Sequence, residues 1–519
     1  MNVRSPRRRR PAAAKLALTI TTIALAATGC SAGSASSESS TPKVGGTAVI
    51  TQIGDPQPGF PLALRGGNAP WIQNVFQPLT RLNDEREPQP VLAKDWKFAD
   101  DRKSMTIDLQ DNVTFHSGRK MTADDVVWAF QKTTDPASGS PVGFIAKQFT
   151  AMDVLSPTSL KITFASAMNP ATVYDFFEQS YIVDKDTYSG LADGSKVIGT
   201  GPYKWGAFRP GVSVELTRYD GYWDKGDGQY LDSIGVEIVG DSTAQLSAVR
   251  SSRAQVAYGL TPTDTQGFAN DPQFGLLSGG GVIYALGLDV TAKPFDDVRV
   301  RQAVAYAIDR NRINQQIFAK TGTVTNVFWG DKAKGITDDQ KNRYAYNLDK
   351  AKSLIEEAGA TGAAVPITVV TYPVIRSEYE IIANNLTAIG LKPQAVIVDE
   401  TTFNSLQNQN KLGPAFFVAH GQVGLSETTL LSSLPSLRSK NNPSHFDTPE
   451  YTKLQQALLS ADAAGSPAAL KDLTNYMLDQ AFSLPIVQAP NQLIVSKKLH
   501  GASITTRGWL RLDQAYLAE

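Results

Sequence analysis

The sequence predicts an α/β fold of at least two domains, and three observations support this. Strand-like and helix-like patterns alternate from Pro42 to the C-terminus without an internal repeat. A βαβ unit can be recognised in the second half of the chain. Without its first 29 residues the chain has 490, more than one hydrophobic core normally serves, so we expect at least two domains. With 42% hydrophobic and 19% charged residues, these domains should form an ordinary soluble globule.

The first half of the chain contains several strand signals and one clear helix start. Residues 46–51 indicate a first strand, and residues 105–109 alternate with a period of two, as a half-buried strand does. Thr122, followed three residues later by Asp125, predicts a capping box at the start of a helix. Residues 199–202 (GTGP) indicate a tight backbone passage into a strand, where glycine can adopt a positive φ.

Two helices can be placed in the second half. Asn347 is a candidate N-cap for a helix with a regular apolar face, and Gly359 is its candidate C-terminal stop. A second helix follows Asp297 and gathers its apolar residues on one side. We expect Arg299, Arg301 and Arg310 to remain solvated on the other side.

The βαβ unit lies between residues 367 and 398. Residues 367–371 form the first predicted strand, and residues 394–398 form the second. Between them, Ser377 and Glu380 open a predicted helix that Gly390 closes. The two strands should therefore be parallel, with a right-handed crossover between them.

The N-terminus has the order of a secretory signal. Residues 16–27 are an apolar run of 12 residues, which is shorter than the roughly 20 residues that span a bilayer. We therefore interpret residues 1–29 as a removable signal peptide. The basic residues that precede the apolar run are Arg4, Arg7, Arg8, Arg9, Arg10 and Lys15.

Cys30 is the single cysteine of the chain, so an internal disulfide is excluded. The run Ala27-Thr28-Gly29-Cys30 resembles a bacterial lipobox, which implies that Cys30 carries a diacylglycerol and becomes the mature N-terminus. Residues 30–42 are rich in Ser, Ala, Gly and Thr and are predicted to be a flexible tether of roughly 20 Å.

The charge balance argues against a nucleic-acid partner. Removing residues 1–29 removes six positive charges and no negative ones, which leaves 44 basic against 50 acidic residues and a net charge of −6. A nucleic-acid-binding protein would present a basic surface instead. We also expect no cofactor and no resident metal.

The motifs of common hydrolases are absent from the sequence. It contains no Gly-x-Ser-x-Gly elbow, no His-Glu-x-x-His and no cysteine pair. Residues 279–281 (GGG) lead into a strand and lack the lysine of a phosphate loop. We therefore predict a protein that is not an enzyme, with an extracytoplasmic hydrolase as the alternative from another class. The four histidines are His116, His420, His445 and His500, and we interpret His116 as structural.

Three motifs distributed along the chain carry a family resemblance. They lie in residues 92–126 (including FHSG and TADDV), in residues 199–223 (GTGPYK, then YW) and in residues 294–310 (PFDDVRVRQA, then AIDR). Together they resemble the family 5 extracellular solute-binding proteins, the peptide and nickel receptors of ABC importers.

The resemblance implies a two-lobed fold of the type II periplasmic-binding-protein kind, with two hinge crossings and an extra subdomain inserted in the first lobe. It further implies a monomer that captures a solute between its lobes by hinge motion and delivers it to an ABC permease for ATP-driven import. With the lipid anchor, the protein would sit on the outer face of the cytoplasmic membrane, at the cell surface or in the periplasm. The predicted boundaries are 43–75, 186–287 and 494–519 for the first lobe, 76–185 for the inserted subdomain and 288–493 for the second lobe.

The solute that the resemblance implies first is a peptide or peptide-like molecule. Receptors of this family hold a peptide mainly by its backbone and pair its ammonium group with a buried aspartate. The corresponding segment here, residues 416–427, contains no Asp and no Trp, so that role is not carried over. Glu427 is a candidate replacement for this aspartate. The alternative interpretation is that the ligand has no free α-amine. A nickel complex, an opine and an oligosaccharide remain as alternatives.

Six further residues are candidates for ligand contact. His420 and Gln422 alternate after an apolar strand and could both face a cleft, and His420 is also the candidate that a nickel complex would use. Tyr372 and Arg376 follow the strand at residues 367–371, at the carboxyl end where α/β clefts bind ligands, and Arg376 could pair with a carboxylate. The remaining candidates are the possible aromatic pocket walls Trp71 and Trp329.

Overall fold

The computed structural model describes residues 42–518 except 64, 227, 331 and 422. The predicted signal peptide, Cys30, the tether up to residue 41 and Gln422 therefore lie outside the described residues. In the part of the chain that is described, no helix is both long and apolar enough to cross a bilayer.

An 11-stranded mixed sheet forms the backbone of the fold, and the alternation of strands and helices confirms the α/β class. Its members along the main path are β15 (Lys392–Val398), β14 (Ala364–Val370), β16 (Ala415–His420), β12 (Phe274–Leu288), β17 (Ser483–Ser496), β11 (Val256–Tyr258), β1 (Thr47–Gln52), β10 (Ser233–Ile238), β9 (Ser213–Arg218) and β8 (Tyr203–Arg209), and β13 (Thr323–Val324) pairs with β17 off this path.

A second, four-stranded antiparallel sheet and several short pairs complete the strands. The four-stranded sheet has the order β4 (Ala93–Phe98), β5 (Ser104–Leu109), β7 (Ser159–Phe164), β6 (Phe149–Ser156). The short pairs are β2 (Thr80–Leu82) with β3 (Pro88–Pro90), β18 (Leu499–His500) with β21 (Tyr516–Leu517), and β19 (Ser503–Ile504) with β20 (Leu510–Arg511).

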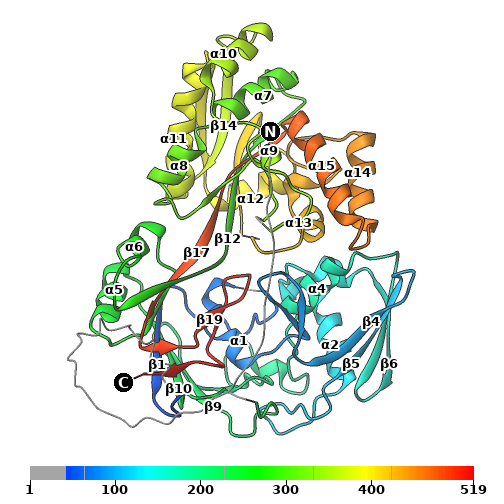
Figure 1. Ribbon diagram of the computed structural model, residues 1–519, viewed down its shortest axis with the longest axis vertical. Helices are drawn as coiled ribbons and strands as arrows, with labels where there is room; N and C mark the ends of the chain where they lie inside the picture. Colours follow the sequence, from blue (N-terminus) through cyan, green and yellow to red (C-terminus); the bar gives the residue numbers. More distant parts are fainter. Residues whose placement is uncertain (1–41, 64, 227, 331, 422, 519) are drawn as a thin grey trace, which may run out of the picture. The chain divides into compact units, whose positions relative to one another are not determined.

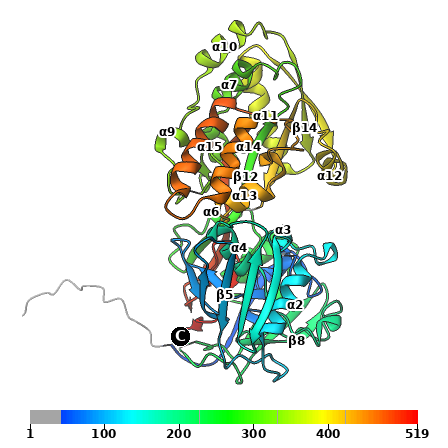
Figure 2. The same ribbon diagram turned by 90° about the vertical axis from the view of Figure 1, so that its right-hand side faces the viewer.

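The helices fall into groups along the chain. Those before β12 are α1 (Ile72–Val75), α2 (Ala123–Thr133), α3 (Gly143–Ala146), α4 (Pro170–Gln179), α5 (Ser242–Arg250) and α6 (Pro262–Gln266). Those between β12 and β17 are α7 (Val298–Ala307), α8 (Arg310–Gln316), α9 (Asp338–Lys341), α10 (Leu348–Glu357), α11 (Pro373–Ala388), α12 (Glu400–Asn408), α13 (Glu427–Ser433), α14 (Pro449–Ser460) and α15 (Ser466–Gln480). Helices α14 and α15 pack side by side in both views (Figure 1, Figure 2).

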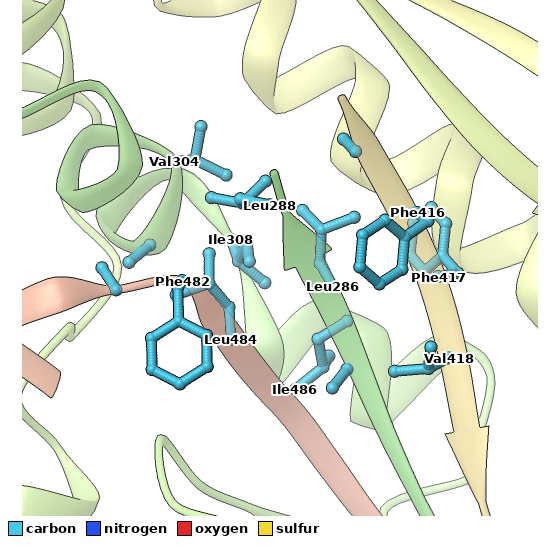
Figure 3. Packing of buried hydrophobic residues seen from close by; sticks show 14 of the residues in the cluster. Leu286, Leu288, Val304, Ile308, Phe416, Phe417, Val418, Phe482, Leu484 and Ile486 are labelled. Atoms are coloured by element: carbon cyan, nitrogen blue, oxygen red, sulfur yellow. The ribbon is translucent and has the colours of Figure 1, made fainter. Parts of the chain in front are cut away.

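The buried apolar side chains form three large clusters. One contains residues between 48 and 76 together with residues between 181 and 256 and between 493 and 515, and a second lies within residues 79–182. The third lies within residues 283–489, where β12, β16 and β17 meet the helices (Figure 3). We propose that these clusters are the cores of the first lobe, the inserted subdomain and the second lobe, and we use these names for the ranges given above.

Two long strands cross between the first and the second lobe. Strands β12 and β17 pair antiparallel over most of their length (Figure 1). Leu484 and Ile486 of β17 belong to the core of the second lobe, whereas Leu493 and Val495 belong to that of the first lobe. The pairing shifts register between Gly279 and Val282, so β12 bends where it passes from one lobe to the other.

Glycine is required at the centre of this bend. Gly280 has a φ of +59°, and a Cβ atom there would lie 2.2 Å from the carbonyl oxygen of Arg507. The glycine run therefore lies inside strand β12, and it admits a close approach of the C-terminal segment to the crossing strands.

Several predicted elements are confirmed. Helix α2 begins with the capping box of Thr122 and Asp125, and Asn347 caps α10 by accepting the amide of Lys350. Strands β14 and β15 are parallel, as the βαβ unit requires. Helix α11 begins at Pro373, four residues before the predicted start, because a proline at the first position is compatible with a helix.

Arg299 is exposed, as predicted, but the expectations for two other arginines were wrong. Arg301 and Arg310 are each only 4% exposed. The Nε atom of Arg301 donates to the carbonyl of Gln480 at 2.8 Å, and that of Arg310 donates to the carbonyl of Pro485 at 2.8 Å. These arginines satisfy carbonyl groups where the chain enters β17, a long-range role that a helical pattern does not reveal.

Residues 199–202 (GTGP) require glycine for a different reason from the predicted one. Gly199 and Gly201 do not have a positive φ, but a Cβ atom would lie 2.0 Å and 2.7 Å, respectively, from the carbonyl oxygen of Val75. His116 packs against the same passage: its Nε2 lies 2.9 Å from the carbonyl of Gly201, and its Nδ1 accepts the amide of Gly199. Burial lowers the pKa of His116 to about 4, so the neutral ring is structural, as predicted.

Candidate functional site

A cavity of about 610 Å³ lies beside the crossing strands. Residues 260–263, at the start of α6, line it from the first lobe, and residues 489–492 of β17 line it from the crossing. From the second lobe it is lined by residues of α8 and α11 and by the residues that follow α8. Its volume is within the range of small-molecule sites, so this cavity is the candidate binding site.

The inner wall of the cavity is apolar and aromatic. Val282 and Tyr284 project from β12, and the ring of Tyr284 lies 5.0 Å from that of Phe318. Burial raises the pKa of Tyr284, and the neighbouring carboxyl of Glu378 raises it further. The hydroxyl of Tyr284 therefore stays protonated and can donate a hydrogen bond.

Amides and hydroxyls surround this wall. Asn384, Asn491 and Gln492 line the cavity together with Ser377 of α11. Gln492 is held in place because its Oε1 accepts from Thr265 at 2.9 Å and its Nε2 donates to Ser278 at 3.2 Å. Such groups hydrogen-bond to neutral polar parts of a ligand, such as peptide groups, and require no formal charge.

The inserted subdomain and the second lobe touch directly elsewhere. The carboxylate of Asp175 accepts the amide of Ser426 at 2.8 Å and pairs with Arg86 at 2.9 Å. Arg86 also donates to the carbonyl of Gly424. Thr172 adds a hydrogen bond of 2.7 Å to Thr428. The start of α13 is therefore attached to α4 by mutually satisfied polar groups.

Arg507 extends this contact from the C-terminal segment. Its Nη1 donates to the carbonyl of Val423 at 2.9 Å, and its Nη2 donates to that of Gly421 at 3.3 Å. Burial lowers the pKa of Arg507. Nearby, burial raises the pKa of Glu178 to about 7, although the amide of Leu82 partly opposes the shift. The carbonyls that follow β16 are thus already occupied by arginine donors from the other lobe.

A smaller cavity of about 270 Å³ adjoins this contact. It lies between residues 82–88 and 169–174 of the inserted subdomain and the residues around α13 and α15 of the second lobe. Glu427 and Arg86 both line it, and burial raises the pKa of Glu427.

The two tryptophan candidates lie within hydrophobic cores. Trp71 is fully buried in the core of the first lobe, 4.7 Å from the ring of Trp205, and its Nε1 donates to Asn68. Trp329 is 2% exposed in the second lobe, and its Nε1 donates to Thr474 at 2.7 Å. Neither tryptophan lines the 610 Å³ cavity.

The remaining candidates are scattered around the two cavities. Tyr372 caps α11 and is 40% exposed, and Arg376 is also exposed; both neighbour the cavity wall without belonging to it. Burial raises the pKa of Tyr372 to about 12. His420 is 8% exposed, with its Nε2 3.3 Å from the hydroxyl of Ser436, and burial lowers its pKa to about 4. Glu427 lines the smaller cavity, and Gln422 lies outside the described residues.

Sequence reasoning did not identify the residues that line the larger cavity. The region after strand 367–371 was anticipated, but the wall is made by Val374 and Ser377 instead of Tyr372 and Arg376. Asn491 and Gln492 carried a usable signal, because they are a polar pair within the apolar run of β17. In the described part of the chain, no group of three or more His, Cys, Asp or Glu side chains is placed to hold a metal ion.

Comparison with known proteins relates this architecture to a family. Residues 87–441, more than half of the chain, match the model of the bacterial extracellular solute-binding proteins, family 5. The chain is 25% identical over 405 residues to heme-binding protein A of Haemophilus influenzae, covering 70% of this chain and 72% of that protein. It is 25% identical over 333 residues to dipeptide-binding protein DppE of Bacillus subtilis, covering 58% of this chain and 59% of that protein.

The fold has a close match among solved structures. The ABC transporter substrate-binding protein CtaP from Listeria monocytogenes superposes with a TM-score of 0.80 at 21% identity, covering 92% of this chain and 100% of that one. The sequence motifs, the two lobes joined by crossing strands and the family match agree. The chain belongs to the family 5 bacterial extracellular solute-binding proteins.

Proposed function

We propose that the protein is the substrate-binding lipoprotein of an ABC importer and that it captures a peptide or peptide-like solute in the 610 Å³ cavity. The observation that carries this proposal is the composition of that cavity wall, which combines elements of both lobes with both crossing strands. A solute held there touches every part that must move during hinge closure, so its binding biases the open and closed states.

The chemistry of the wall favours a peptide-like solute. Asn384, Asn491 and Gln492 supply amide donors and acceptors, and Tyr284 and Phe318 supply an apolar surface. Amides can bind a peptide backbone without selecting particular side chains, and water fills the remaining space. The relative DppE is described as a dipeptide-binding protein, which agrees with this choice.

Ligand identity can be tested on the purified chain with Cys30→Ser, which prevents lipidation. Native mass spectrometry should show a carried-over solute, and a pool of dipeptides to tetrapeptides should raise the melting temperature. A ligand at one hundred times its Kd stabilises a protein by about 2.7 kcal/mol. Absence of both effects, together with stabilisation by a nickel–histidine complex, an opine or an oligosaccharide, would contradict the peptide proposal.

The same peptides separate a receptor from a hydrolase. When the protein is present at a small fraction of the peptide concentration, a receptor leaves the peptide concentration unchanged over hours, whereas a hydrolase lowers it. Disappearance of peptide at a rate proportional to protein concentration would replace this proposal with an enzymatic one. His420→Asn should leave peptide binding unchanged, because His420 is bonded to Ser436 and does not line the cavity.

The lipid anchor needs a separate test in cells. We propose that Cys30 carries the anchor and that residues up to 42 tether the receptor to the outer face of the membrane beside its permease. The wild-type chain should fractionate with membranes and incorporate labelled palmitate. The Cys30→Ser chain should incorporate no label and leave the membrane fraction, and retention of label by this variant would exclude Cys30 as the site.

A further inference from the structure

One buried carboxyl group has no partner in the described part of the chain. Glu378 of α11 is fully buried, and neither of its carboxyl oxygens has a hydrogen-bond partner there. Two other fully buried carboxylates among the described residues have ion-pair partners: Asp125 pairs with Arg119, and Asp175 pairs with Arg86. Buried polar groups are nearly always hydrogen-bonded, so Glu378 requires an explanation.

Glu378 lies immediately behind the wall of the 610 Å³ cavity. Val374 and Ile381 line that cavity, and they are four residues before and three residues after Glu378 on the same helix. Residues with these spacings share one face of a helix. Tyr284 approaches from β12, lines the cavity and is close enough for the carboxyl to alter its pKa. Glu378 does not itself line the cavity, but its helix neighbours Val374, Ser377 and Ile381 do.

The free protein gains no stability from this carboxyl. Burial raises the pKa of Glu378 well above its usual value, and no other cause contributes to the shift. Burial therefore favours the protonated, neutral form of this carboxyl. A buried hydroxyl without a partner costs about 1–3 kcal/mol, whereas leucine or methionine at the same place would cost nothing of this kind. A residue that lies beside a cavity and destabilises the free protein is expected to interact with a bound ligand.

We propose that Glu378 is the carboxylate that receives the cationic group of the solute, an ammonium or a guanidinium, which enters from the cavity between Tyr284 and Ile381. The carboxyl releases its proton to the solvent when the cation arrives, so the buried site stays neutral overall. The resulting pair is stable because both partners are present in the closed site. This inference rests on the proposed function only in taking the 610 Å³ cavity as the solute site.

The experiment compares amines with their neutral counterparts. Ala-Ala-Ala carries its cation at the α-amine, and its N-acetyl form carries no cation. N-acetyl-Ala-Lys-Ala carries the cation on a side chain, and putrescine is an amine that is not a peptide. Calorimetry with the wild-type chain should show that at least one amine binds about tenfold or more tightly than acetylated Ala-Ala-Ala. Measurements in buffers of different ionisation enthalpy should show that this binding releases a proton.

Two variants and one control decide the assignment. Glu378→Gln and Glu378→Met should weaken the preferred amine by about tenfold or more, abolish proton release and leave acetylated Ala-Ala-Ala unaffected. Without ligand, Glu378→Met should raise the melting temperature by about 2–4 °C, because the unpaired group is removed. Glu356→Gln, an exposed residue of α10, should change none of these quantities.

The outcomes distinguish this inference from the proposed function. Equal affinities for Ala-Ala-Ala and its acetyl form, with no preference for either other amine, overturn the role of Glu378 while peptide binding stands. Binding of putrescine alone, lost in Glu378→Met, supports the role of Glu378 and contradicts a peptide solute. Full amine affinity in both variants, a lower melting temperature of Glu378→Met, or failure of every amine to bind the wild-type chain overturns the inference.

Discussion

Asp175 and Glu378 are both fully buried carboxyl groups, but their surroundings differ completely. Asp175 lies where the inserted subdomain meets the second lobe, and each of its oxygens has a partner, Arg86 for one and Ser426 for the other. Glu378 lies behind the 610 Å³ cavity and has no partner among the described residues. The hydrogen-bonding capacity of Asp175 is used within the chain, whereas that of Glu378 is unused.

The comparison distinguishes polar groups that are already bonded within the chain from polar groups that a ligand could still bind. Around Asp175 the donors Arg86 and Arg507 already occupy the carbonyls of Gly421, Val423 and Gly424, so a solute there would have to displace them. Around Glu378 the neighbouring wall offers amides and a tyrosine hydroxyl beside open volume. We therefore expect mutations near Asp175 to change mainly stability, and mutations near Glu378 to change mainly binding and its proton linkage.

The largest effect should come from Asp175→Ala. This change leaves Arg86 and the amide of Ser426 without their acceptor. Removing one partner of a buried pair costs about 3 kcal/mol or more, and Arg86 is partly exposed, so we expect about 3 kcal/mol in urea unfolding. Asp100→Ala, an exposed position in the same subdomain, serves as the control. A loss of less than about 1 kcal/mol would mean that the pair behaves as a surface salt bridge.

The next effect is a pH dependence that Glu378→Gln should remove. The folded pKa of Glu378 is raised, so the group causes no ionisation penalty below the unfolded pKa near 4.5, and the protein loses stability as the pH rises from there toward the folded pKa. Relative to wild type, the Gln variant should therefore gain about 1.4 kcal/mol per pH unit above pH 4.5, measured by urea unfolding between about pH 5 and 6.5. A constant difference across this range would show that Glu378 is ionised in the folded protein.

Arg507→Met should have an intermediate effect. It removes two hydrogen bonds from a charged donor to the carbonyls of Gly421 and Val423. It also removes a buried Nε that has no partner in the described residues, which offsets part of the loss. We expect a loss of about 1–2 kcal/mol in urea unfolding, with faster amide exchange in residues 421–426. Unchanged exchange in that segment would show that Arg507 does not hold it.

Local sequence patterns were sufficient for the elements that local interactions determine. The capping box of Thr122 and Asp125 and the cap at Asn347 each involve a few neighbouring residues, and both were predicted correctly. The start of α11 was placed too late because Ser377 and Glu380 imitate a capping pair, whereas Pro373 already occupies the first helical position. Arg301 and Arg310 appeared to be solvated because their acceptors lie about 175 residues further along the chain.

The candidate site depended even more on long-range packing. Glu378 stands in the charged sequence RSEYE and looks like a surface residue of a helix. Its burial results from the packing of α11 against β14, β15, α7 and α10, which no local pattern reports. Tyr372 and Arg376 were predicted from the general rule that ligands bind at the carboxyl ends of strands. That rule points to the turn beside the 610 Å³ cavity, but it could not specify which side of α11 faces the cavity.

The smallest predicted effect tests whether the contact around Asp175 is satisfied group by group. Thr172 donates a buried hydrogen bond to Thr428 across the boundary between the inserted subdomain and the second lobe. Thr172→Val should cost about 1 kcal/mol in urea unfolding, because it leaves the hydroxyl of Thr428 with one partner fewer. Adding Thr428→Val should cost less than the sum of the two single changes, since the second substitution removes the group that the first left unsatisfied. Strict additivity would mean that the two hydroxyls find other partners, and that this contact is less complete than the pairing of Asp175 indicates.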